Sequence, residues 1–161
     1  MAEPSVSTVI VNWNHGHLLP GCLDALIAQE YSELDITVVD NASQDGSPEV
    51  IAHSYPDVHL WTFPNNLGFS TALNWGVSHT KGDFVLSLNP DVIVKKDFVA
   101  ELVEAIIQED EIGIVAPKLL QNRNPALLDS TGLFIDQRRR PFDRGQGEPD
   151  TGQYDALSDV F

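Results

Sequence analysis

Short apolar segments alternate with segments of helical periodicity through the first 116 residues. The apolar segments predict strands over residues 7–11, 34–39, 58–63, 84–88 and 112–116. The intervening segments predict helices near residues 18–29, from residue 47 onward, and near residues 68–79 and 98–107. Ser47 is the expected N-cap of the second of these helices. Strands that alternate with helices are typical of a mostly parallel sheet with helices on both faces. We therefore expect an α/β fold with three layers, α/β/α.

The stretch from Gly82 to Val94, GDFVLSLNPDVIV, places an acid at the end of one of these strands. Its apolar run suits a strand that is buried on both faces. Pro90 cannot donate a hydrogen bond, so strand pairing should end there. Ligands of open parallel sheets bind outside the carboxyl ends of the strands, which makes Asn89 and Asp91 candidate ligand-binding residues. A lone Asp at a strand end more often only caps a turn.

Polar clusters follow three of the expected strands. They are Asn12-Trp13-Asn14, Asp40-Asn41-Ala42-Ser43 and Asn89-Pro90-Asp91. Trp13 could stack on a planar heterocycle while Asp40 accepts a hydrogen bond from a ring N–H. Asp91 could hold Mg²⁺ or Mn²⁺ against a diphosphate, because hard cations prefer oxygen ligands. The alternatives are that Trp13 is an ordinary core residue and that Asp40 and Asn41 only shape a turn.

Charge and cysteine content exclude several classes of function. A net charge of −15 at pH 7 argues against a nucleic-acid partner. The basic run Arg138-Arg139-Arg140 is interpreted as a solvated loop, with contact to a diphosphate or an anionic lipid surface as the alternative. Cys22 is the single cysteine, which excludes an intramolecular disulfide and fits a cytoplasmic location. The five histidines lack metal-binding spacing. We expect a soluble protein, with peripheral attachment to the inner face of a membrane left open.

Four segments, taken in order, resemble glycosyltransferase family 2 of the GT-A fold, and most closely its bacterial rhamnosyltransferase-like branch. They are VIVNWN, VVDNASQDGS, NNLGFSTALNWGVSHTKGDFVLSLNPD and GIVAPKLL, and the tail RGQGEPDTGQYD is similar as well. The resemblance implies an enzyme of cell-wall or polysaccharide biosynthesis. Such an enzyme transfers a sugar, with inversion, from a dTDP- or UDP-linked donor to a saccharide or lipid-linked acceptor, with a divalent cation as cofactor.

The resemblance also implies which residues bind the nucleotide-sugar. They are Asn12, Trp13, Asn14, Asp40, Asn41, Ser43, Asp45, Asn66, Gly68, Asn74, Asn89 and Asp91. The usual Asp-x-Asp metal motif of the family corresponds to Asn89-Pro90-Asp91, so that Asp91 alone is the implied metal ligand. The loss of one carboxylate weakens the affinity for a cation without abolishing it.

The segments that resemble the family do not include a catalytic base. In the family this base is an acid further downstream, and the chain stops before such a motif, so the catalytic residue stays unknown. We expect residues 1–120 to form the nucleotide-sugar-binding domain and residues 121–161 to be the irregular, truncated start of an acceptor-side half. The alternatives are a non-catalytic nucleotide-sugar-binding module and a nucleotidyltransferase. An exposed sheet edge would also favour association into a homo-oligomer.

Overall fold

The computed structural model describes residues 3–159. The chain divides into two compact units, Met1–Ala100 and Glu101–Phe161, and each is described by itself. This division lies before the boundary expected at residue 120. In the described part of the chain, no helix is long and apolar enough to cross a membrane.

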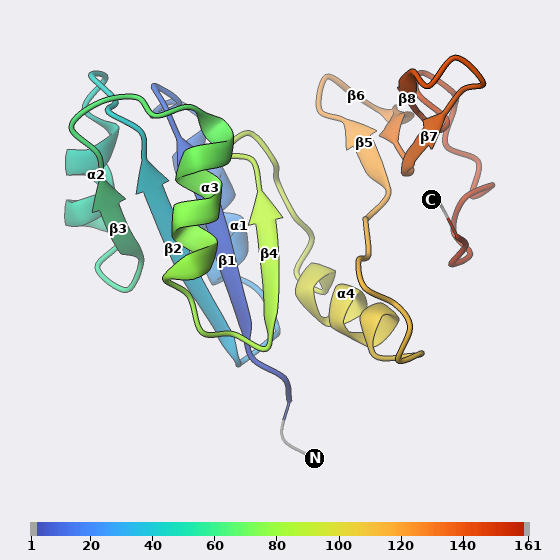
Figure 1. Cartoon of the computed structure of the whole chain (residues 1–161), viewed down its shortest axis with the longest axis horizontal. Helices are drawn as coiled ribbons and strands as arrows, with labels where there is room; N and C mark the ends of the chain where they lie inside the picture. The colour runs from blue at the N-terminus through green and yellow to red at the C-terminus, as the bar shows by residue number, and fades with distance from the viewer. Residues whose placement is uncertain (1–2, 160–161) are drawn as a thin grey trace. The chain divides into compact units, whose positions relative to one another are not determined.

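Strands and helices alternate through the first unit, as the sequence predicts (Figure 1). The elements are β1 (Val6–Asn12), α1 (Leu19–Ile27), β2 (Leu34–Asp40), α2 (Ser47–Ser54), β3 (His59–Thr62), α3 (Phe69–Ser78) and β4 (Phe84–Leu88), followed by α4 (Phe98–Ile106), which begins in this unit. The four strands form one sheet in the order β3-β2-β1-β4, and every neighbouring pair is parallel.

Both faces of the central strands are covered by helices. On one face, Ile10 and Val38 pack against apolar residues of α1 and α2, including Leu23 and Ile51. On the other face, Val9 and Val39 belong to a cluster with Ala72 of α3. Figure 1 shows α3 in front of the sheet and α1 and α2 behind it. Because side chains alternate across a strand, the consecutive apolar residues at the ends of β1 and β2, such as Val9-Ile10 and Val38-Val39, supply both clusters.

Gly76 lets α3 lie unusually close to the sheet. A Cβ atom added at this position would lie 2.5 Å from Val9 Cγ1 and 3.0 Å from Val39 Cγ2. Distances this short cannot be accommodated without movement of the helix or the strands. The absence of a side chain at Gly76 therefore sets the distance between α3 and the two central strands.

Three local expectations were wrong. β4 lies at the edge of the described sheet with Val85 44% exposed, so it is not buried on both faces. The N-cap of α2 is Gly46, with φ +79°, and no side chain caps this helix, since the Ser47 hydroxyl accepts from Asn12 Nδ2 and donates to Asp45. Residues 112–116 form no strand, and Ile114 is 88% exposed, so this run lacks the buried neighbours that stabilise a strand.

The second unit is built from antiparallel strands, which corrects the expectation of an irregular segment after residue 120. β5 (Leu119–Gln121) pairs with β6 (Asn124–Ser130), and β7 (Leu133–Ile135) pairs with β8 (Pro141–Asp143). Arg144 fixes this unit through hydrogen bonds to Thr131 Oγ1 (2.9 Å) and Thr131 O (2.8 Å). Its guanidinium also lies 5.6 Å from the Phe134 ring and 5.0 Å from the Tyr154 ring. Polar and cation–π contacts thus replace a large apolar core here.

Candidate functional site

The carboxyl ends of β1, β2 and β4 meet at one edge of the sheet, which we call the rim. Asn12 and Asp40, the last residues of β1 and β2, are direct neighbours in the strand register. Leu88, the last residue of β4, pairs with Ile10 of β1, and Asn89 and Asp91 follow it. The topology therefore brings all three predicted polar clusters to the same edge.

Asn12 and Asp40 form the buried floor of the rim. Asn12 Nδ2 donates to Asp40 Oδ1 (2.7 Å), to Ser47 Oγ (2.8 Å) and to Ser43 Oγ (3.1 Å). The other carboxylate oxygen of Asp40 accepts from the Ser43 N–H (2.9 Å). Asn12 is fully buried and Asp40 is 1% exposed. Each oxygen of Asp40 thus accepts one hydrogen bond within the protein, which gives Asp40 a positioning role, and its contact with a heterocycle stays a prediction.

A second set of hydrogen bonds fastens the segment before α3 to the end of β2. Asn41 Nδ2 donates to Asn66 Oδ1 (2.9 Å), and the Leu67 N–H donates to Asn41 Oδ1 (2.8 Å). The Gly68 N–H also donates to Asn66 Oδ1 (2.8 Å). Gly68 has φ +84°, a conformation that glycine adopts without strain, and it is the N-cap of α3. Asn66 and Gly68 are therefore brought to the rim beside Asn41.

A third set joins the loop after β1 to the loop after β2. The Asn14 N–H donates to Ser43 Oγ (2.9 Å), and the Gln44 N–H donates to Asn14 Oδ1 (2.8 Å). Asp45 accepts from the Gly16 N–H (2.8 Å) and from the Ser47 hydroxyl (2.6 Å). These hydrogen bonds, the one from Ser47 above all, hold the pKa of Asp45 below its usual value. The two loops consequently form one cross-linked surface.

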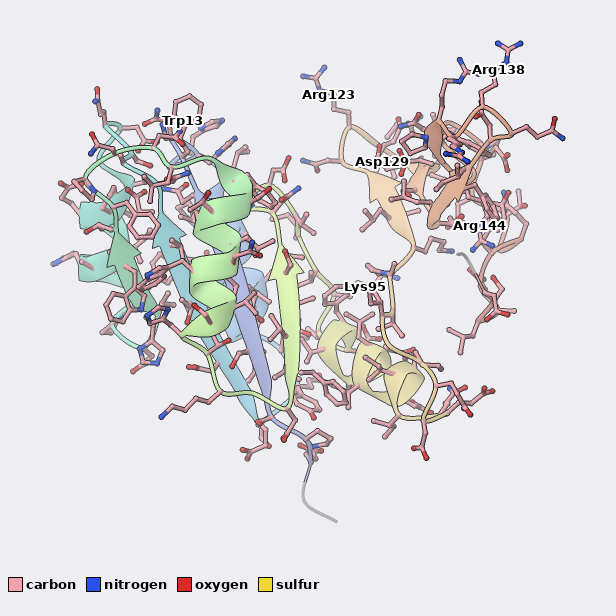
Figure 2. All side chains as sticks on the ribbon, in the orientation of Figure 1. Trp13, Lys95, Arg123, Asp129, Arg138 and Arg144 are labelled. Atoms are coloured by element: carbon pink, nitrogen blue, oxygen red, sulfur yellow. The ribbon has the colours of Figure 1, made fainter. Side chains whose placement is uncertain are left out.

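Four of the predicted residues that are exposed on unit 1 lie outside these hydrogen-bond networks. Trp13 is 51% exposed and extends outward at the rim in Figure 2, so the alternative that it is a core aromatic is wrong. Asn89 and Asp91 are exposed after β4, and Asn74 is exposed on α3. Within residues 3–159, none of these four side chains takes part in a side-chain hydrogen bond. They are free to contact a ligand.

The residues at the end of β4 suit a hard divalent cation. Asp91 offers an exposed carboxylate that forms no ion pair within the described residues, and Asn89 adds a carboxamide oxygen nearby in sequence. No group of three or more His, Cys, Asp or Glu side chains that could hold a metal occurs between residues 3 and 159. A cation here would therefore keep most of its coordination positions for phosphate oxygens and water, as Mg²⁺ and Mn²⁺ do.

Cys22 contacts this segment but is no candidate ligand. Its thiol donates to the carbonyl oxygen of Asn89 at 3.6 Å. Burial, and secondarily the charge of Asp91, raise the pKa of Cys22 to about 12. The side chain consequently stays a neutral thiol at physiological pH, while a metal ligand would have to be a thiolate.

Sequence reasoning missed two residues of the network. Ser47 was interpreted as a helix cap, but its hydroxyl links Asn12 to Asp45. Gly16 donates its N–H to Asp45, and a Cβ atom there would lie 2.9 Å from Asp45 Oδ2. The available signal was the spacing in Asp45-Gly46-Ser47, which is typical of a serine that bonds back to the preceding acid.

Comparisons with known proteins agree on one family. The family model described as "Glycosyl transferase family 2" matches residues 7–155. An uncharacterized glycosyltransferase of Rickettsia bellii is 34% identical over 139 residues, which cover 82% of this chain and 19% of that protein. The chain spans 15–36% of the length of eight curated relatives that it matches.

Two solved structures show the same fold. The mannosyltransferase PcManGT of Pyrobaculum calidifontis, in complex with GDP-Man and Mn²⁺, is 28% identical with a TM-score of 0.63, over 67% of this chain and 34% of that chain. Residues 1–349 of Staphylococcus aureus TarS, in complex with UDP-GlcNAc, are 18% identical with a TM-score of 0.59. That match covers 72% of this chain and 38% of the TarS chain, and it concerns the fold alone.

Proposed function

We propose that this chain, which belongs to glycosyl transferase family 2 and has the GT-A fold, is the donor-binding part of a glycosyltransferase. The observation that carries the proposal is the rim, where the hydrogen-bonded floor of Asn12 and Asp40 lies at the same sheet edge as the exposed Trp13 and the exposed Asp91. An aromatic side chain and a hard-cation ligand at one sheet edge suit the base and the diphosphate of a nucleotide-sugar. Ligands of open α/β sheets bind at such an edge.

Different residues of the chain bind or position different parts of the donor. Trp13 stacks on the base, and Asn12 with Asp40 hold the two loops that frame it. The base is thymine or uracil by resemblance to the rhamnosyltransferase-like branch, and guanine is a third candidate because PcManGT binds GDP-Man. dTDP-rhamnose is the donor that the branch suggests.

A divalent cation, Mg²⁺ or Mn²⁺, is the proposed cofactor. Asp91 would hold it, with Asn89 as a second oxygen donor, and its chemistry when bound is to neutralise charge on the leaving diphosphate. The Mn²⁺ in the PcManGT complex supports this assignment. The exposed Asp91 carboxylate, which forms no hydrogen bond or ion pair within residues 3–159, leaves room for such an ion.

The remaining steps are proposed for the whole enzyme. Inverting transfer to a saccharide or lipid-linked acceptor requires a general base, and no residue of this chain is assigned to that role. The cytoplasmic face of a membrane is the proposed location, and the exposed edge of β4 could support a homo-oligomer. If no transfer occurs in the whole protein, the second candidate is a non-catalytic nucleotide-sugar-binding module.

Calorimetric titration of the purified chain tests the donor site. UDP, dTDP and GDP are each titrated with and without Mn²⁺, and the proposal expects one base to bind most tightly and Mn²⁺ to increase its affinity. Sugar nucleotides of the preferred base are then assayed for transfer and for hydrolysis. A folded chain that binds none of the three nucleotides with Mn²⁺ present would contradict the proposal. Metal-dependent binding by the chain would support the donor site, and the binding module would be supported only if the whole protein also showed no transfer.

A further inference from the structure

The hairpin of residues 133–143, which we call the basic hairpin, carries an arginine-rich turn between β7 and β8. The turn is closed by Asp136, whose carboxylate accepts from the backbone N–H groups of Arg138 (2.8 Å) and Arg140 (2.9 Å). The Arg139 N–H donates to the Asp136 carbonyl (2.8 Å), and Arg139 adopts φ +60°. These hydrogen bonds fix the backbone of the turn, and Figure 2 shows the Arg138 side chain directed outward.

Positive charge is concentrated around this turn in an otherwise acidic chain. All five arginines of the chain lie between residues 123 and 144, although its net charge is −15. Arg140 is paired with Asp136 at 2.8 Å, and Arg144 is held inside the unit. Within residues 3–159, the guanidinium groups of Arg123, Arg138 and Arg139 form no hydrogen bond or ion pair. Figure 2 shows Arg123 and Arg138 extending from the same end of the second unit.

Exposed apolar side chains adjoin the arginines. The register pairs Ile135 with Pro141 and Leu133 with Asp143, so Leu133 and Ile135 share one face of the basic hairpin. Leu133 is 51% exposed and Ile135 is 50% exposed, and Pro141 is exposed beside them. On the opposite face, Phe142 is 50% exposed. A two-stranded hairpin with apolar residues on its strands and arginines at its tip is amphipathic along its length.

We infer that the basic hairpin docks on an anionic lipid surface. Arginines at the turn can reach the lipid phosphates, while Ile135 and Leu133 enter the boundary between headgroups and acyl chains. Apolar side chains favour a lipid partner over a free phosphate or a nucleic acid, because neither of those buries them. The inference assigns residues to the membrane contact proposed above, but it does not depend on sugar transfer.

The acidic surface of the chain does not prevent this contact. Electrostatic interactions between exposed groups are screened beyond about 8 Å at physiological ionic strength, so the field of the turn dominates near its own tip. Asp136 is neutralised there by Arg140. Asp143 lies opposite Leu133 on the same face but at the end of the hairpin away from the turn, so Ile135, which is next to the turn, enters deepest.

Flotation of the chain with lipid vesicles tests the inference in the absence of donor and acceptor. Vesicles of phosphatidylcholine with about one third phosphatidylglycerol should bind the chain, and pure phosphatidylcholine vesicles should not. Replacing both Arg138→Gln and Arg139→Gln should weaken binding about 30-fold, since each arginine near an anionic surface contributes about 1 kcal/mol. The matched control, Lys95→Gln with Lys96→Gln, removes the same charge from exposed lysines of the first unit and should leave binding unchanged.

Two further measurements distinguish a lipid contact from general charge attraction and from a loss of fold. Ile135→Ser should weaken the binding that persists at 0.5 M salt, where the electrostatic part is screened. Circular dichroism and thermal melting of every variant check that the fold is intact. Failure to bind anionic vesicles, equal binding to neutral ones, or equal losses in the arginine and lysine variants would overturn the inference. Light scattering without vesicles tests for self-association. If the chain self-associates and the arginine variant does not, the partner of the basic hairpin is a second copy, which would also overturn the inference.

Discussion

Asn12 and Asp40 are the last residues of two adjacent parallel strands, and they are joined side chain to side chain by a buried hydrogen bond of 2.7 Å. This hydrogen bond lies under the two loops that frame the rim. Asn12 Nδ2 also donates to the hydroxyl groups of Ser43 and Ser47. A charged acceptor in a buried position strengthens such a bond but makes its loss costly. This pair therefore couples the stability of the sheet edge to the shape of the proposed donor site.

Removing the carboxylate with Asp40→Ala should reduce both stability and nucleotide affinity. The change leaves the Ser43 N–H without its acceptor, and we expect the free energy of unfolding to fall by about 1–3 kcal/mol. Affinity for the preferred nucleoside diphosphate should fall roughly ten-fold or more as the loops loosen. Urea unfolding and calorimetry measure the two effects. Asp35→Ala, at the exposed other end of β2, is the control, and equal losses in both variants would contradict the role of Asp40.

Asp91→Asn should remove the effect of the cation while leaving the fold intact. The carboxylate is exposed, so the melting temperature should not change. The increase in nucleotide affinity caused by Mn²⁺ should fall roughly ten-fold or more, because loss of even an outer-shell partner of a metal ligand typically costs about 10–100-fold. Asp57→Asn, at the exposed turn before β3, is the matched control. Unchanged Mn²⁺ dependence in the Asp91 variant would show that the cation binds elsewhere.

Gly76→Ala should destabilise the protein, although alanine is the better helix former by about 1 kcal/mol. The new methyl group would overlap Val9 and Val39, and such overpacking typically costs about 1–3 kcal/mol. Thr71→Ala, an exposed substitution on the same helix, should leave stability unchanged or slightly increase it. Denaturant midpoints compare the two variants. A more stable Gly76 variant would mean that α3 can move away from the sheet at little cost.

The hydrogen bonds to Asp45 predict a particular dependence on pH. Because its pKa is lowered in the folded state, the folded protein favours the carboxylate, and this stabilisation is present above the usual value of 3.8. It is lost as the pH falls through the lower, folded-state pKa. A carbon-detected NMR titration should place the Asp45 midpoint below 3.8. Ser47→Ala removes the largest cause and should raise that midpoint, and an identical midpoint in the variant would contradict the assignment.

The hydrophobic periodicity and the polar residues that follow the strands were sufficient to predict most elements of the first unit. The runs containing Val9 and Val38 are apolar on both faces, and each is followed by a helical period, so their pairing as buried parallel strands could be predicted. The rule that polar residues after parallel strands meet at one edge also located Asn12 and Asp40. The run around Ile114 failed because an apolar sequence does not supply its own partner strand.

The hydrogen bonds of the rim could not be predicted from local sequence patterns. The hydrogen bond from Asn12 to Ser47 joins positions that are separated by a helix and a strand, and no local pattern encodes it. Asp40 is buried and accepts a hydrogen bond from the Ser43 N–H, an internal contact that the sequence did not predict, while its contact with a ligand stays a prediction. In the second unit, Arg144 makes polar contacts with Thr131, and contacts of this kind leave no hydrophobic period to detect.

The position of β1 in the sheet has a consequence for biosynthesis. β1 is synthesised before the other strands of its sheet, yet one of its edges is covered only by β4, which begins at Phe84. Until β4 has emerged from the ribosome, one edge of β1 stays unpaired in the nascent chain. The exposed segment, VSTVIVN, contains no charged residue and no proline. Segments of this kind are prone to intermolecular pairing. Chaperone capture of nascent chains, or slow translation upstream of residue 84, should therefore affect the yield of this protein more than its final stability.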